Sequence, residues 1–135
     1  MTAYWRAGRL SPDSSVKFYF GRDHGILARG RGVTFGLPPT LTRLAAYREN
    51  LDLNDYPLPW VSAVVGGDLI ASPVARATVE QGGRPRVNLK DHAGDQTPIN
   101  LQLVPEAVDL CAGASRPVAT LAEVVRVLGL PRRSA

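Results

Sequence analysis

The chain has 135 residues, of which 44% are hydrophobic and 21% are charged, and this balance excludes a mainly disordered or low-complexity protein. The formal net charge is +4 and Cys111 is the only cysteine, which excludes an intramolecular disulfide and a zinc site made of several thiolates. No segment approaches the roughly 18 consecutive apolar residues of a membrane span. We therefore expect a soluble, cytoplasmic protein with no membrane partner, folded as one domain over residues 1–135.

The first third of the chain predicts β-structure. Residues 16–20 and 26–35 are rich in aromatic and β-branched side chains, and the turn-like segment 21–25 separates them. This pattern is typical of two strands joined as a hairpin or a short meander.

A helix is predicted from residue 40 to about residue 51. Two prolines break the β pattern just before Thr40, whose hydroxyl can accept a hydrogen bond from the first helical turn as the N-cap. The next segment, 52–59, holds an asparagine and two prolines and predicts a loop. This loop leads to Trp60, which we expect to anchor the next strand in the core.

A second hairpin is predicted around the pair Gly66 and Gly67. Two glycines supply the positive φ angles that a tight hairpin turn requires, so we expect residues 61–65 and 69–79 to pair as antiparallel strands. Pro73 would then lie at an edge or a bulge, because proline cannot donate a hydrogen bond within a sheet.

The last third of the chain predicts two more strands and two helices. Residues 87–89 and 99–103 alternate apolar with polar side chains, as strands with one solvent-exposed face do. A short helix is expected over residues 106–112, and a final helix begins at the capping box of Thr120 and Glu123. Together these elements predict an α+β fold, with a mainly antiparallel sheet of hairpins packed against two or three helices.

Positive charge is concentrated near the N-terminus. Residues 1–48 carry eight lysines or arginines and two aspartates, whereas the rest of the chain carries eight basic and ten acidic residues. Such an asymmetry indicates an anionic partner, although arginine on a solvated surface is the simpler explanation. Basic and aromatic residues are mixed in the expected first hairpin, as on single-stranded nucleic-acid surfaces. The candidate polyanion-binding residues are Lys17, Arg22, Arg29 and Arg31.

The dipeptide Asp-His occurs twice and contains the only two histidines of the chain. If the turns that hold the two dipeptides lie at the same end of the sheet, a histidine can act as a general base oriented by a carboxylate, or both can bind a metal. No third ligand is indicated, so we expect no metal and no other cofactor. Polar side chains on surface turns are the simpler interpretation. The candidate catalytic residues are His24, His92, Asp23 and Asp91.

Three hypotheses about function remain open. No set of acid, base, nucleophile or metal ligands stands out, and Cys111 is expected to be a buried thiol, so the first hypothesis is a non-enzymatic interaction or assembly module. The apolar segment 56–60 and the edge expected at Pro73 predict a dimer, a larger oligomer or a protein partner. The second hypothesis is a nucleic-acid or polyanion binder that uses the basic residues 1–48. The third is a small enzyme with His24 and His92 in a shared cleft.

Overall fold

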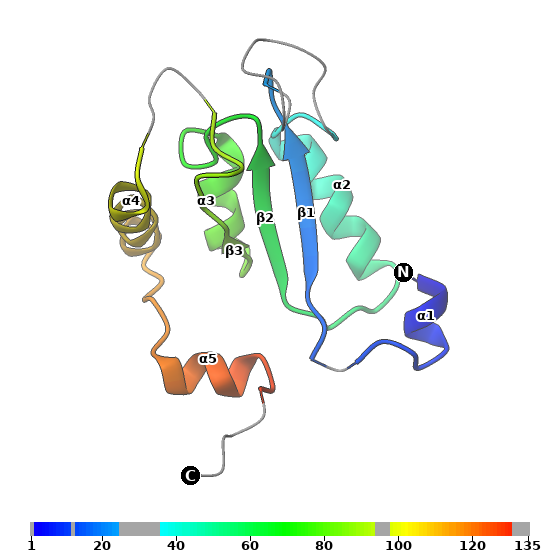
Figure 1. The fold of residues 1–135 in the computed structure, drawn as a ribbon. Coiled ribbons are helices and arrows are strands. Elements are labelled where there is room, and N and C mark those ends of the chain that lie inside the picture. The colour runs from blue at the N-terminus through cyan, green and yellow to red at the C-terminus, as the bar shows by residue number, and fades with distance from the viewer. Residues whose placement is uncertain (1, 12, 25–35, 94–97, 131–135) are drawn as a thin grey trace.

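A computed structural model describes residues 2–11, 13–24, 36–93 and 98–130. Its three strands are β1 (Val16–Gly21), β2 (Trp60–Val65) and β3 (Arg84–Pro85), in the order β1-β2-β3. Both neighbouring pairs are parallel. Figure 1 shows the two long strands side by side, with their arrowheads at the same edge of the sheet.

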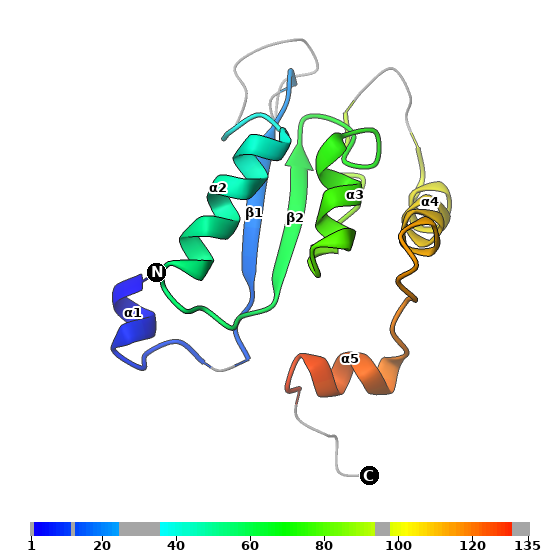
Figure 2. The same ribbon diagram turned by 180° about the vertical axis from the view of Figure 1, so that it is seen from behind.

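Helices connect the strands. The helix α2 (Leu41–Asp52) joins β1 to β2, and α3 (Pro73–Glu80) joins β2 to β3. A short α1 (Thr2–Arg6) precedes the sheet, and α4 (Asn100–Gly113) and α5 (Leu121–Val127) follow it. Seen from behind, α2 and α3 both lie in front of the strands, so they cover the same face of the sheet (Figure 2).

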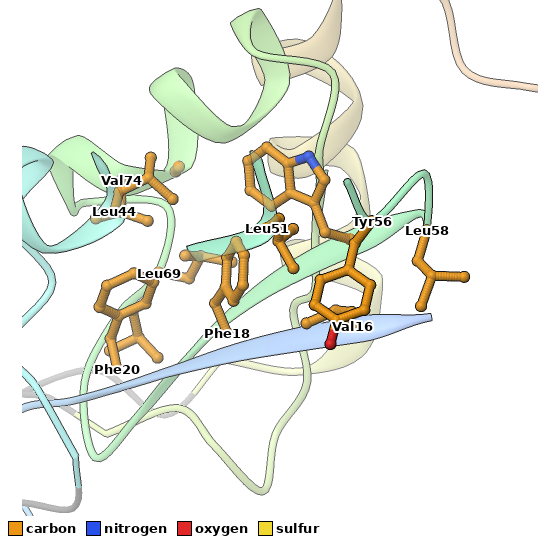
Figure 3. Close-up of a cluster of buried hydrophobic side chains, with 12 residues drawn as sticks. Val16, Phe18, Phe20, Leu44, Leu51, Tyr56, Leu58, Leu69 and Val74 are labelled. Atoms are coloured by element: carbon orange, nitrogen blue, oxygen red, sulfur yellow. The ribbon is translucent and has the colours of Figure 1, made fainter. Parts of the chain in front are cut away.

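The core lies between this face and the two helices. Alternate residues of β1 are buried, namely Val16, Phe18 and Phe20, because successive side chains of a strand point to opposite faces. They share one cluster with Leu44 of α2 and Val74 of α3 (Figure 3). Burial of these side chains against a common face is the main favourable contribution to the fold.

The expected antiparallel sheet of hairpins is wrong, because the described sheet is parallel and the fold is of the α/β class. A helix separates each pair of neighbouring strands, and a strand that returns through a crossover helix pairs in parallel. Residues 69–79 were expected to form a strand, but residues 73–80 form α3. Pro73 occupies its first turn, where the missing N–H costs nothing.

Two other expected strands are also absent from the described part of the chain. Ile99 is the N-cap of α4, and residues 100–103 form its first turn. The helix extends to Gly113 and contains Pro105 instead of beginning after it. Residues 87–89 follow the two-residue strand β3 and form no strand themselves. The expected second strand of the first hairpin, residues 26–35, lies entirely outside the described residues.

Predictions that depended on local capping are confirmed. Thr40 is the N-cap of α2 and accepts a hydrogen bond from the backbone N–H of Arg43 at 3.3 Å. Thr120 and Glu123 form the capping box of α5. However, α5 contributes no buried residue, so it is not one of the helices that the core packs against. Trp60 begins β2 and is buried, as expected.

No helix within the described ranges combines the length and the apolar character that crossing a bilayer requires.

We expect the change Phe20→Ala to lower the free energy of unfolding by about 3–5 kcal/mol, because the side chain is fully buried among β1, α2 and α3 and leaves a cavity. Chemical denaturation measures this loss. The control Leu53→Ala removes a side chain that is 74% exposed, and its effect should stay within about 0.5 kcal/mol. Similar losses for the two variants would contradict the described core.

The capping box predicts a pH effect on α5. Hydrogen bonds from the backbone N–H and the hydroxyl of Thr120 hold the pKa of Glu123 below its ordinary value of 4.5. The resulting stabilisation of α5 is present above pH 4.5 and is lost as the pH falls through the lowered pKa. In an NMR titration, Thr120→Ala should raise the pKa of Glu123, and an unchanged titration curve would show that the box does not form.

Candidate active site at the carboxyl ends of the strands

The carboxyl ends of β1 and β2 bring distant segments together. In parallel α/β sheets ligands bind outside this edge, where the loops that follow the strands meet. Arg22 to His24 follow β1, and Gly66 to Asp68 follow β2. The segment 86–93 follows β3 and returns to the same edge.

The turn at Gly66 and Gly67 holds both Asp-His segments. The backbone N–H of His24 donates to the carbonyl of Gly66 at 3.2 Å, and the N–H of Gly66 donates to the carbonyl of Asp91 at 2.9 Å. The N–H of Ala93 donates to the carbonyl of Gly67 at 3.2 Å. The two dipeptides therefore meet at one turn, although 68 residues separate their histidines in the sequence.

Both glycines are required for this close approach. Gly66 has a φ of +73°, and a Cβ atom there would overlap the carbonyl oxygen of His24. At Gly67 an added Cβ would lie 2.6 Å from Cδ of Arg22, well inside van der Waals contact. The pair was expected to form a hairpin turn, but its role is to let the chain after β1 pack against the turn after β2.

A polar cluster lies beside this turn. The guanidinium Nη1 of Arg86 donates to Oδ2 of Asp91 at 3.1 Å, and the amide Nδ2 of Asn88 donates to the same oxygen at 2.8 Å. The backbone N–H of Asp91 donates to Oδ1 of Asn88 at 2.8 Å. Asp91 is only 7% exposed, so these contacts offset the cost of burying its carboxylate.

The cluster lines a small cavity together with His92 and the apolar residue Leu69. Its volume of about 10 Å³ has room for about one water molecule. A second cavity, of about 330 Å³, lies at the same edge of the sheet and is lined by Arg22, Asp23 and residues at the first turns of α2 and α3. An organic substrate could enter the second cavity but not the first.

The structure places the candidate catalytic residues around one edge, but in two groups. Asp91 and His92 line the small cavity, whereas Asp23 lines the larger one. His24 is tied to Gly66 through its backbone and lines neither of the two. In the described ranges no group of three His, Cys, Asp or Glu side chains could hold a metal ion.

Only two of the four candidate polyanion-binding residues lie in the described part of the chain. Lys17 lies in β1 with its ammonium 5.4 Å from the ring centre of Tyr19, and Arg22 lies beyond the end of that strand, over Gly67. The remaining two, Arg29 and Arg31, lie outside the described residues.

The sequence analysis missed Arg86 and Asn88. One signal was available, because Asn88 and Asp91 are three residues apart just before a turn, which suits a side chain that bonds to the backbone three residues ahead. The link to Arg86 becomes visible only with β3 in place, since Arg86 is held by a backbone hydrogen bond to Ser62 of β2 at 2.9 Å.

Comparison with known proteins defines the class of this chain. A family model described as BKACE, beta-keto acid cleavage enzyme, matches residues 1–130. The chain belongs to this family. Over 104 residues it is 35% identical to the 3-oxoadipate:acetyl-CoA acetyltransferase of Cupriavidus necator, a match that covers 74% of this chain and 36% of that enzyme. The chain therefore spans little more than a third of the length of its curated relative.

Family membership overturns the first functional hypothesis, because the chain belongs to a family of enzymes and is not a non-enzymatic assembly module. Nothing in the comparisons supports nucleic-acid binding either. The expected hairpin was to provide the binding surface, but its first strand, β1, pairs in parallel with β2. The expected oligomer stays a prediction, but its motivation is gone. Tyr56, Leu58 and Trp60 are buried in the core, and Pro73 lies in a helix.

A pair of glycine variants tests the close approach at the turn. Gly66→Ala should destabilise the protein by about 1–3 kcal/mol more than Gly82→Ala. Both glycines have positive φ angles, +73° and +85°, but an added Cβ at Gly82 meets nothing within 4 Å. The difference in the free energy of unfolding therefore measures the contact with His24 apart from backbone strain. Equal losses would show that the turn tolerates a side chain.

Proposed function

We propose that this chain forms part of an active site that cleaves a carbon–carbon bond of a β-keto acid, with Arg86 and Asp91 at its centre. Family membership supports the reaction class. The observation that supports the location is the ion pair between the half-exposed Arg86 and the buried Asp91 at the carboxyl edge of a parallel sheet.

The chemistry of the substrate requires a positive group. A β-keto acid carries a carboxylate, and breaking the bond beside its keto group leaves an electron pair that must be stabilised as an enolate. A guanidinium offers a planar set of N–H donors to either anion. In the described residues Nη1 of Arg86 is bonded to Asp91, and its side chain is 37% exposed, so the other donors of Arg86 can bind the substrate.

Asp91 and Asn88 act as positioning residues in this proposal. The carboxylate of Asp91 fixes one end of the guanidinium. Asn88 holds Asp91 through two hydrogen bonds of 2.8 Å, one donated by its amide to the carboxylate and one accepted from the backbone N–H of Asp91. A charged group held in this way stabilises developing charge without first having to reorient. His92 lines the same cavity, and we assign to it the transfer of a proton, because histidine is the side chain most often used as a general acid or base.

The name of the relative suggests the second substrate. The Cupriavidus enzyme is named for 3-oxoadipate and acetyl-CoA, and we propose that this chain acts on a β-keto acid together with a coenzyme A ester. Arg22 provides a second positive group at the same edge, beside the cavity of about 330 Å³. This arrangement suits an anionic co-substrate that approaches the Arg86 cluster from the β1 side.

Substitution of the ion pair tests the proposal. With 3-oxoadipate and acetyl-CoA as substrates, we expect Arg86→Gln to lower kcat/KM by at least about 100-fold, since it removes the positive charge. Arg86→Lys should retain part of the activity, because it keeps the charge and loses the planar donor set. Product formation is followed by mass spectrometry.

The matched control is Asp109→Asn, which changes a carboxylate on the exposed side of α4 and should leave kcat/KM unchanged. Asp91→Asn should resemble Arg86→Gln in kcat/KM. An Arg86→Gln variant that is folded and fully active would exclude this cluster from the active site.

A further inference from the structure

A single arginine links the end of α4 to the turn that precedes β3. Nη1 of Arg116 donates to the backbone carbonyl of Val79 at 2.9 Å and to that of Gly83 at 2.8 Å. Nη2 donates to the carbonyl of Gly82 at 3.1 Å. Val79 lies in the last turn of α3, and Gly83 immediately precedes β3. One guanidinium therefore spans the whole connection between α3 and β3.

The carbonyls at the end of α3 suit a positive group. The last carbonyls of a helix have no partner within the helix, and they carry the negative end of its dipole. A guanidinium forms stronger hydrogen bonds than a neutral donor and holds its N–H groups in a fixed planar fork. Arg116 is half-buried, so its charge is screened less than that of a fully exposed side chain. These bonds hold residues 81–83 in one conformation.

The end of α4 is shaped to present Arg116. The backbone N–H of Arg116 donates to the carbonyl of Cys111 at 2.9 Å, and the N–H of Ser115 donates to the carbonyl of Ala112 at 2.9 Å. These two bonds form a Schellman motif, which ends a helix with a residue in the left-handed conformation. That residue is Ser115, with a φ of +53°, although glycine adopts this conformation at less cost. The chain reverses here, and Arg116 reaches back to α3.

The strand β3 does little by itself to fix the path of the chain. It consists of Arg84 and Pro85, and a proline has no N–H to donate. The next bond to β2 is the one from the N–H of Arg86 to the carbonyl of Ser62, at 2.9 Å. The point at which the chain enters β3 therefore decides how Arg86 meets the sheet.

Gly83 is that entry point, and it is held from three sides. Its N–H donates to the carbonyl of Thr78 at 2.8 Å, and its carbonyl accepts from Arg116. On the third side, a Cβ atom added at Gly83 would overlap the ring of Trp60. Of these three contacts, only the one with Arg116 comes from beyond β3 in the sequence, and it is the one that a substitution removes without changing α3 or the core.

We propose that Arg116 is a positioning residue for Arg86. By holding the turn between α3 and β3, it sets the register of β3 against β2, and this register determines the direction from which Arg86 reaches Asp91 and the substrate. The effect of Arg116 on catalysis rests on the function proposed for Arg86. Its effect on the guanidinium of Arg86 is measurable without any substrate.

NMR exchange spectroscopy on the folded chain measures this effect. Rotation about the Nε–Cζ bond of Arg86 breaks its charge-assisted hydrogen bond to Asp91, so the rotation rate reports how well the two groups are aligned. We expect Arg116→Gln to raise this rate at least about tenfold. Asp91→Asn removes the charge of the partner and gives the rate for an unpaired guanidinium. An unchanged rate in folded Arg116→Gln would overturn the proposal.

The matched control is Arg76→Gln. Arg76 is an exposed arginine of α3 that also bonds to the end of α4, through the carbonyl of Gly113 at 3.4 Å, and it pairs with Glu80. It does not bond to the turn before β3, so its removal should leave the rotation rate of Arg86 unchanged. Equal acceleration by Arg76→Gln and Arg116→Gln would overturn the proposal, because any loss of contact between α3 and α4 would then suffice.

Arg116→Lys is the milder change and decides the question if Arg116→Gln does not fold. An ammonium keeps the charge but cannot span three carbonyls as a planar fork does, so an intermediate rotation rate is expected. A rate equal to that of the unmodified chain would overturn the requirement for a guanidinium.

A double-mutant cycle tests the consequence for catalysis. With 3-oxoadipate and acetyl-CoA, Arg116→Gln should lower kcat/KM at least about tenfold, and it should have no further effect in the Arg86→Gln background, because Arg116 acts through Arg86. Equal losses in both backgrounds would show a merely structural role and overturn the proposal. If the unmodified chain cleaves nothing, the proposed function fails, whereas the rotation rate of Arg86 still decides whether Arg116 positions it.

Discussion

The parallel pairing of β1 with β2 is the constraint on which the rest of the structure depends. It requires a crossover through α2, and the same geometry is repeated through α3 to reach β3. Because both crossovers lie on one face, Phe18 and Phe20 can pack against both helices in one core. The carboxyl ends of the strands then lie at one edge, which is why residues after β1, β2 and β3 meet there.

Capping was predictable from the sequence, because a cap depends on residues three positions apart. Thr40 and Thr120 were identified correctly for this reason. The segments 69–79 and 99–103 were misassigned, since short apolar stretches fit either a strand or a helix until a partner surface selects one. Val74 and Val79 suit β-structure by composition, but they are buried on one side of α3 against the sheet.

The candidate site was predictable only in part. The repeated Asp-His dipeptide pointed to two segments that do meet, but their meeting depends on the absence of side chains at Gly66 and Gly67, which no local pattern reveals. Arg86 was missed because its contact with Asp91 follows from the path of the chain after β3. The first hypothesis, a non-enzymatic protein, was preferred because this contact was not visible. In the sequence, Arg86 and Asp91 resemble ordinary surface charges until the burial of Asp91 is known.

Pro85 limits how readily another strand can form hydrogen bonds with the free side of β3. The N–H of Arg86 points toward β2, as its bond to Ser62 shows. Because neighbouring residues of a strand direct their N–H groups to opposite sides, the position of Pro85 faces away from β2. A strand that added there at random would leave a carbonyl unpaired. Exposed sheet edges promote aggregation unless something interrupts their hydrogen bonding, and Pro85 is such an interruption on the side of β3 that faces away from β2 in the described sheet.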